Sequence, residues 1–197
     1  MNSHELSTRI HSPVPFWFLN GHIDEWHIVR ELEMMREKGI GDVIVHPRHG
    51  LEVDYLSDAW FEIFGWCVRE AKKNGMHVWI YDELNWPSGT AGMSVMRVDP
   101  SFRSKYLSVE EKPLLQIDFD SFQPGLYMAA ANIQGGRVTK TRETSDVQTL
   151  KALTGPWRIF NCTLRHDRFY VDTLSKEAID CFRRLTYEEY YLSLIHI

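Results

Sequence analysis

The chain contains 197 residues, of which 44% are hydrophobic and 13% aromatic, and its formal net charge is −5. This hydrophobic content is typical of a chain with a packed core, which excludes an intrinsically disordered protein. The acidic balance, and the lack of any apolar run near the ~20 residues of a membrane span, argue against nucleic acid and membranes as partners.

The N-terminal part of the chain alternates between predicted strands and predicted helices. Residues 14–19 form a short apolar run that indicates a buried strand, and Asn20 and Gly21 end it. Asp24 has the side chain of a helix cap, and the apolar residues after it recur at helical spacing up to a stop at Gly39. The first strand is therefore followed at once by an amphipathic helix.

A second strand, a second helix and a third strand follow in the same order. Residues 42–46 and 76–81 are apolar runs, and Ser57 caps the helix between them. Parallel strands are buried on both faces and read as continuous apolar runs, so the pattern indicates an α/β fold with a parallel sheet. The first turn carries no glycine-rich phosphate fingerprint, which favours a (β/α)8 TIM barrel over an open sheet. A complete barrel needs about 250 residues, so we expect a partial barrel made of its first three βα units.

The pattern changes near residue 94, where short apolar runs alternate with Gly, Pro and polar breaks. This change predicts a β-rich insertion after the third strand, and either Thr173 or Ser175 then begins a helix. The expected organisation is the first part of the barrel at 1–93, the insertion at 94–172, a helix returning to the barrel at 173–191 and a non-native tail at 192–197.

The ends of the chain and its cysteines indicate the context of the protein. Residues 1–6 lack the basic region and apolar core of a secretory signal, so we expect a cytoplasmic protein. Residues 192–197 fit no preceding pattern and resemble a translated sequencing adapter, hence the expected non-native tail. Cys67, Cys162 and Cys181 are an odd number at wide spacing, which predicts free thiols and neither a disulfide nor a zinc framework.

Polar side chains follow the ends of the three predicted strands. Residues after each strand of a barrel meet at one face, where the active site lies. The predicted substrate-binding residues are Asn20, His22, His46, Arg48, Tyr81, Asp82, Glu83 and Trp86. Carboxylates and amides bind sugar hydroxyls, and Trp17 or Trp86 has a flat ring for the apolar face of a pyranose. The pattern therefore predicts a carbohydrate substrate.

Several of these residues also have a structural interpretation. Asp82 and Glu83 suit the role of ordinary loop acids, and Trp86-Pro87 suits that of a packing corner. Arg48 either binds an anionic group or pairs with Asp82 or Glu83. The histidines match no metal-binding motif, so structural roles are favoured for them and no cofactor is evident from the residues.

Three stretches carry a resemblance to a known family. They are Trp17-Phe18-Leu19-Asn20-Gly21, Gly50-Leu51 with Tyr55-Leu56-Ser57 and Trp60, and Tyr81-Asp82-Glu83-Leu84-Asn85-Trp86-Pro87-Ser88-Gly89-Thr90-Ala91-Gly92. Together they resemble the opening of the α-L-rhamnosidase-like glycoside hydrolases (family 106) and their uncharacterised relatives. The segment from Tyr170 to Tyr187 resembles the part before the fourth barrel strand of that family. The third stretch is the specific part of the resemblance.

The resemblance implies a large multidomain enzyme whose barrel cleaves a terminal sugar by inverting hydrolysis, with calcium as an associated ion. Inverting hydrolysis needs two carboxyl groups roughly 6.5–9.5 Å apart. The resemblance places this catalytic pair beyond residue 197, so we expect Asp82 and Glu83 to be substrate-binding or supporting acids and the isolated fragment to be inactive. The alternatives are another TIM-barrel enzyme acting on a small metabolite and a non-catalytic carbohydrate-binding module. Neither the residues nor the resemblance predicts the oligomeric state.

Overall fold

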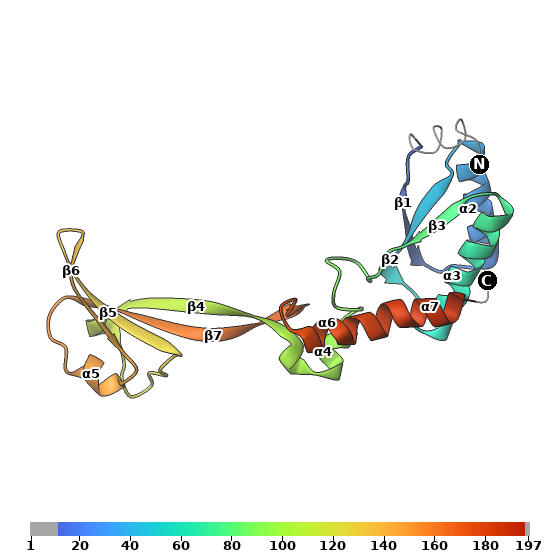
Figure 1. Cartoon of the computed structure of the whole chain (residues 1–197). Coiled ribbons are helices and arrows are strands. Elements are labelled where there is room, and N and C mark those ends of the chain that lie inside the picture. The colour runs from blue at the N-terminus through green and yellow to red at the C-terminus, as the bar shows by residue number, and fades with distance from the viewer. Residues whose placement is uncertain (1–11, 196–197) are drawn as a thin grey trace. The chain divides into compact units, whose positions relative to one another are not determined.

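The computed structural model describes residues 12–195, and the chain divides into two compact units (Figure 1). The first, called here the βα unit, comprises Met1–Arg103 and Phe169–Ile197. The second, called here the β unit, comprises Ser104–Arg168. The domain boundaries expected from the sequence stay predictions, and each unit is considered by itself.

The βα unit is built on three neighbouring parallel strands in the order β1-β2-β3. These strands are β1 (Phe16–Gly21), β2 (Asp42–Leu51) and β3 (His77–Ile80). Phe18 lies opposite His46 in the β1–β2 ladder, and Ile44 lies opposite Trp79 in the β2–β3 ladder. The strand–helix–strand order expected from the sequence is therefore confirmed for the first three strands.

Helices α2 (Glu25–Glu37) and α3 (Asp58–Lys73) connect the strands. Asp24 and Ser57 cap them as expected: the backbone N–H of His27 donates to the Asp24 carboxylate over 2.9 Å, and that of Trp60 donates to the Ser57 hydroxyl over 3.3 Å. Both helices pack on one face of the sheet (Figure 1). The buried core between them includes Trp17, Leu19, Ile28, Leu32, Val43, Val45, Trp60 and Phe64.

The predicted partial TIM barrel is wrong. The described residues form a three-stranded parallel sheet and a separate four-stranded antiparallel sheet. After β3 the chain passes through a loop to the short α4 (Ser94–Val98) and η1 (Pro100–Phe102), and not through a third long helix to a fourth parallel strand. The local βα pattern was read correctly, but closure of a barrel depends on pairings between distant strands that such a pattern does not encode.

The C-terminal helical segment of the βα unit consists of α6 (Lys176–Arg183), a π-helical turn η3 (Arg184–Glu188) and α7 (Glu189–Leu194). Ser175, and not Thr173, caps α6 by accepting from the N–H of Ala178 over 3.3 Å. Tyr190 reaches the main core, where its hydroxyl accepts from the Trp60 indole N–H over 2.9 Å. A second buried cluster joins this segment to the loop after β3 through Ala91, Val95, Met96, Val171, Ala178, Cys181 and Phe182.

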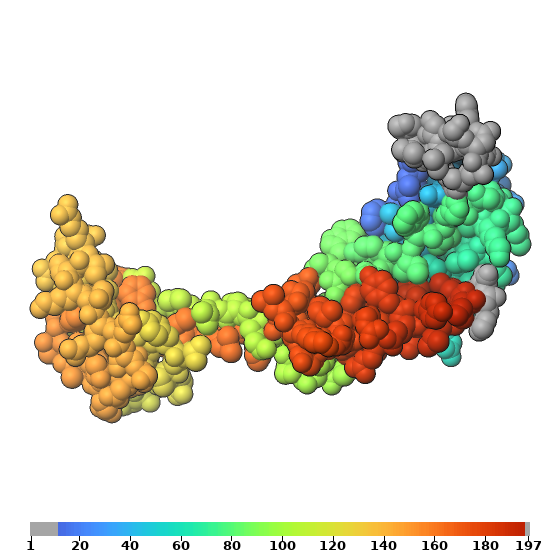
Figure 2. Space-filling model, viewed as in Figure 1, coloured from blue at the N-terminus to red at the C-terminus, as the bar shows by residue number. Residues whose placement is uncertain are grey.

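The β unit is a four-stranded sheet in the order β4-β7-β5-β6. Its elements are β4 (Arg103–Pro113), η2 (Leu114–Gln116), β5 (Tyr127–Gln134), β6 (Arg137–Thr144), α5 (Val147–Lys151) and β7 (Trp157–Val171). Gly135 and Gly136, both at positive φ, form the turn between β5 and β6, and this hairpin projects from the rest of the unit (Figure 2). Leu114, Met128, Leu150 and Ile159 are buried in its core.

The remaining expectations concern the ends of the chain and the thiols. Residues 1–6, where no secretory signal is expected, lie outside the described residues, as do 196 and 197 of the expected tail. Leu192 to Leu194 of that tail continue α7. All three cysteines are free, with Cys67 and Cys181 buried. Within residues 12–195 the helices are too short or too polar to cross a membrane.

Candidate functional site

The sheet face opposite α2 and α3 carries aromatic side chains. Successive residues of a strand point to opposite faces, and in β1 the buried Trp17 and Leu19 alternate with the exposed Phe16 and Phe18. Trp79 of β3 is exposed as well. Trp17 itself lies in the core and donates its indole N–H to Glu31 of α2, so its ring is not available to a ligand. Exposed rings on a sheet face are a common feature of ligand-binding and protein-binding surfaces.

His46 of β2 lies at the centre of this aromatic face. Its imidazole is fully buried and touches four rings, with centroid distances of 5.8 Å to Phe16, 5.1 Å to Phe18, 4.1 Å to Tyr81 and 5.5 Å to Trp86. The Trp86 ring is stacked on it at an interplanar angle of 17°. These five side chains, together with Arg48, are called here the aromatic cluster.

The protonation of His46 follows from its surroundings. Burial among the rings lowers the pKa of the imidazole, and the nearby Arg48 charge acts in the same direction, while a hydrogen bond to the Asn85 carbonyl opposes them. Nε2 lies 3.0 Å from that carbonyl oxygen, which accepts only, so Nε2 carries the hydrogen. Nδ1 is then a lone-pair acceptor, and no described residue donates to it. The neutral imidazole is therefore the stable form near neutral pH.

Arg48 lies on the aromatic cluster and not beside an acid. Its Cζ is 3.5 Å from the centroid of Trp86 and 5.3 Å from that of Phe18, distances typical of cation–π contacts. Among the described residues it forms no ion pair, so the pairing with Asp82 or Glu83 considered from the sequence is not seen. Its guanidinium N–H groups are available to a ligand.

Glu83 organises the loop after β3 from inside. Its side chain is 1% exposed, and both carboxylate oxygens accept hydrogen bonds. Oε2 accepts from Thr90 N, Thr90 Oγ1 and Ala91 N over 2.7, 2.9 and 2.8 Å, and Oε1 accepts from Leu84 N and Gly92 N over 2.9 and 2.5 Å. These contacts describe a role in shaping the loop. Its expected role in substrate binding stays a prediction.

Asn85 connects the same loop to the end of β2. Its backbone is in the left-handed region at φ +68°, a conformation that asparagine tolerates better than most residues. Its side-chain oxygen accepts from His49 N over 2.8 Å, and its N–H donates to Pro47 O over 3.2 Å. Its backbone carbonyl accepts the hydrogen bond from His46 Nε2. The loop is thereby held against β2, which brings Trp86 onto Arg48.

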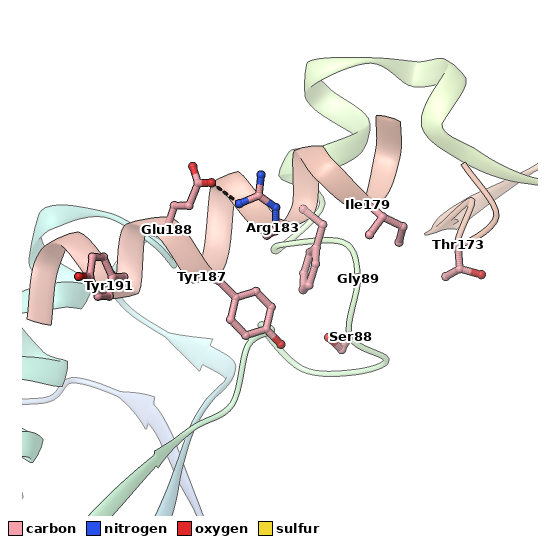
Figure 3. Close-up of a pocket in the computed structure, with 9 residues that line it drawn as sticks. Ser88, Gly89, Thr173, Ile179, Arg183, Tyr187, Glu188 and Tyr191 are labelled. Carbon is pink, nitrogen blue, oxygen red and sulfur yellow. Dashed lines mark hydrogen bonds and ion pairs between the residues drawn. The ribbon is translucent and has the colours of Figure 1, made fainter. Parts of the chain in front are cut away.

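Asp82 connects the loop to the C-terminal helical segment. Its Oδ1 accepts from the Ser88 hydroxyl over 2.6 Å, and its Oδ2 accepts from the Tyr187 hydroxyl. The hydrogen bond to Asp82 is the main cause that raises the pKa of Tyr187 to about 12. Ser88 and Tyr187 also line a mainly apolar cavity of about 630 Å³, whose other walls include Ile179 and Phe182 of α6 (Figure 3).

The eight predicted binding residues fall into two groups. The structure brings together His46, Arg48, Tyr81 and Trp86 in the aromatic cluster, with Asp82 and Glu83 in the adjoining loop. Asn20 and His22 lie beyond this group: Asn20 is exposed at the end of β1, and His22 Nδ1 lies 3.5 Å from Glu52. Within residues 12–195, neither makes a hydrogen bond or ring contact with the cluster.

Three contributors to this region were not identified from the sequence. Phe16 and Phe18 belong to a predicted buried strand, and Phe18 also to the family resemblance, but neither was predicted to bind a ligand. Their alternation with Trp17 nevertheless indicates two apolar faces. Tyr187 was placed on a helix with no role, and its contact with Asp82 spans more than 100 residues of chain. No local sequence pattern predicts a contact between residues so far apart in the chain.

The donor groups do not fit a calcium ion. The described residues contain no group of three His, Cys, Asp or Glu side chains arranged to hold a metal. Calcium binds six to eight oxygen ligands, whereas the Glu83 oxygens already accept from five protein donors. The calcium expected from the resemblance therefore has no donor set in this region.

The comparisons with known proteins give a distant likeness among solved structures. No protein-family model matches the chain, and no curated protein matches it either. Among solved structures the chain is similar to the rhamnosidase from Novosphingobium sp. PP1Y, with a TM-score of 0.42 and 19% sequence identity. The similarity covers 66% of this chain and 15% of the rhamnosidase, so this chain spans a small part of that protein. A rhamnosidase is thus a distant structural neighbour, and nothing in the likeness identifies family 106.

Proposed function

We propose that the aromatic cluster is a sugar-binding surface and that the chain is the substrate-binding part of an α-L-rhamnosidase-like glycoside hydrolase. The observation that carries the proposal is the position of Arg48, which has no acidic partner among the described residues and lies 3.5 Å from the ring of Trp86. Hydrogen-bond donors and flat apolar rings side by side are the two elements that recognise a pyranose.

The rings of the cluster offer apolar contact area. Trp86 rests on His46 and Arg48, yet 56% of its surface is exposed, and Phe16 and Phe18 are also exposed beside it. The C–H groups on one side of a sugar ring pack against such rings, and aromatic side chains offer a large apolar area for this contact. This part of the surface supplies contact area with little polarity.

The polar groups around the rings suit hydroxyls. The Arg48 guanidinium has five N–H donors, and the Tyr81 phenol adds a group that both donates and accepts. Burial, and the charges of Asp82 and Glu83, raise the pKa of Tyr81, which keeps its hydroxyl protonated at neutral pH. A ligand that lacks hydroxyls leaves these groups unpaired, so the surface favours sugars over apolar molecules.

The two carboxylates next to the aromatic cluster, Asp82 and Glu83, are not free for hydrolysis. Glu83 is saturated by loop donors, and Asp82 accepts from Ser88 and Tyr187. An inverting mechanism needs one carboxyl group free to protonate the leaving oxygen and another free to activate water. We therefore expect the 197-residue chain to bind a sugar without cleaving an aryl glycoside.

Isothermal titration of the whole chain with L-rhamnose and a panel of other monosaccharides tests the proposal. Trp86→Ala and Arg48→Ala are each expected to weaken binding about tenfold, since one stacking or charged hydrogen-bond contact is worth roughly 1.4 kcal/mol. Trp26→Ala is the matched control, because Trp26 is an exposed tryptophan on α2. A chain that binds no sugar, or variants at the cluster that bind as well as the control, would contradict the proposal.

A further inference from the structure

The β unit contains a cavity of its own that lies outside the aromatic cluster. Its volume is about 630 Å³, within the range of about 300–1,000 Å³ typical of small-molecule sites. Strands β4 and β7 and the segment that leads to β5 form its walls. The residues important here are Gln116, Asp118, Phe122, Gln123, Asn161 and Arg165.

The wall before β5 is held in place by buried side-chain hydrogen bonds. Asn161 of β7 is 6% exposed, and its amide accepts from Gly125 N over 2.7 Å and donates to Gln123 O over 2.9 Å. A Cβ at Gly125 would lie 2.2 Å from the Cys162 carbonyl oxygen, so only glycine permits this approach. A wall fixed before a ligand arrives lowers the entropic cost of binding.

The same wall has a second internal support. The Asp118 carboxylate accepts from Asp120 N over 3.1 Å and from the Ser121 hydroxyl over 2.7 Å. The Ser121 hydrogen bond is the main cause that lowers the pKa of Asp118, so the carboxylate is ionised at neutral pH and remains an acceptor. Phe122 packs edge-on against Phe119 with centroids 5.9 Å apart.

Several polar groups of the cavity have no partner in the described part of the chain. The side-chain amides of Gln116 and Gln123 and the guanidinium of Arg165 form no hydrogen bond or ion pair there. Each amide offers two donors and one acceptor, and the guanidinium offers five donors. These groups line the cavity in addition to Phe122, the aromatic residue of the wall.

The balance of charge indicates the kind of ligand. Arg165 and Lys112 are cationic, while Glu110 and Asp118 are anionic, and Lys112 Nζ lies 2.6 Å from the Glu110 carboxylate. Equal numbers of each sign favour neither an anion nor a cation. Free amides, a free guanidinium and an acceptor carboxylate bind hydroxyls in both directions.

From these observations we infer that the β unit binds a neutral, hydroxyl-rich ligand, an uncharged oligosaccharide, in the cavity between β4, β7 and the segment before β5. This site is separate from the aromatic cluster, and it makes the β unit a carbohydrate-binding module within the chain. Arg165 and Gln123 are the residues that contact the sugar.

Binding of the whole chain to a glycan microarray with neutral and acidic oligosaccharides tests the inference, followed by calorimetry with the best neutral glycan. Arg165→Ala and Gln123→Ala are expected to weaken binding about tenfold and about threefold. Arg142→Ala is the matched control, because Arg142 is an exposed arginine on β6, two strands away from β7. Unchanged thermal melting of each variant shows that the fold is intact.

The outcomes separate this inference from the proposed function. Loss of neutral-glycan binding in Arg165→Ala and Gln123→Ala, with Arg142→Ala unaffected, supports a site in the β unit. Binding that is lost only in Trp86→Ala refutes the inference and leaves the aromatic cluster as the sugar site. A preference for acidic glycans, or no glycan binding at all, also overturns it.

Discussion

Replacement of Glu83 by glutamine is expected to destabilise the loop after β3. The carboxylate accepts three hydrogen bonds at Oε2, two from Thr90 and one from Ala91, and two at Oε1, from Leu84 N and Gly92 N. Glutamine keeps one oxygen, which best replaces Oε2. Its NH₂ group then faces the N–H groups of Leu84 and Gly92, so two donors lose their acceptor and meet another donor.

The magnitude follows from the number of unpaired groups. A buried donor without a partner costs about 1–3 kcal/mol, so two such donors cost roughly 2–6 kcal/mol. The loop is partly accessible at Gly92, and water reaching that N–H reduces the cost toward the lower end of this range. Even 2 kcal/mol is a large fraction of the ~5–15 kcal/mol that stabilises a typical domain.

Two measurements check this prediction. Urea unfolding, extrapolated linearly, gives the change in the free energy of unfolding. Hydrogen exchange reports the loop directly, and the amides of Thr90, Ala91 and Gly92 are expected to exchange faster in the variant. Glu62→Gln is the control, because Glu62 is exposed on α3. A loss below about 0.5 kcal/mol, the scatter of surface substitutions, together with unchanged exchange of these amides would refute the reasoning.

Other predictions concern single titrating groups and thiols. Because the pKa of Tyr187 is raised to about 12, its contribution to the stability of the fold is present below pH 10 and is lost as the pH rises through about 12. Asp82→Asn should move the pH at which the Tyr187 phenolate absorbance appears back toward 10. A transition that does not move would contradict this. Because the pKa of His46 is lowered in the folded state, its contribution to the free energy of unfolding is fully present above pH 6.5 and is lost as the pH falls below it. In His46→Phe the urea midpoints measured above and below pH 6.5 should therefore differ less than in the unmodified protein. An equal pH dependence in both proteins would argue against this. A thiol reagent should label the partly exposed Cys162 first, because Cys67 and Cys181 are buried and burial raises the pKa of Cys67. The fast phase of labelling should therefore be absent in Cys162→Ser. A fast phase that remains in this variant would contradict the prediction.

Local structure in the βα unit was predictable because its causes are local. The caps at Asp24 and Ser57 each use a side-chain oxygen that accepts from the backbone N–H three residues later. This short spacing can be recognised in the sequence. The extent of β2 was not predictable in the same way. It continues to Leu51, with Pro47 opposite Leu19, because a neighbouring strand pairs with residues that look like a loop.

The candidate site was predictable in part, for a related reason. That the ends of adjacent parallel strands meet is a rule of topology, and it correctly brought His46, Arg48 and Tyr81 together. The role of each residue in the loop after β3 depends on which carboxylate oxygen accepts a hydrogen bond from which backbone N–H. Glu83 faces the amides of residues 90–92, a spacing of seven to nine residues that belongs to no helix or strand period.

The aromatic cluster also admits contact with protein, and its polar groups decide between the two uses. An interface core is depleted of Lys, Glu and Asp but enriched in arginine and aromatic residues, so residue type alone does not separate the two uses. Burying a guanidinium without an acid against apolar side chains, however, costs several kcal/mol. Arg48 has no acid among the described residues and lies against Trp86 and Phe18. A protein partner would have to bring a carboxylate to this one position, whereas the hydroxyls of a sugar accept from the guanidinium at many orientations. Arg48→Met keeps the length of the side chain and removes its donors, so it should weaken sugar binding but strengthen any apolar protein contact.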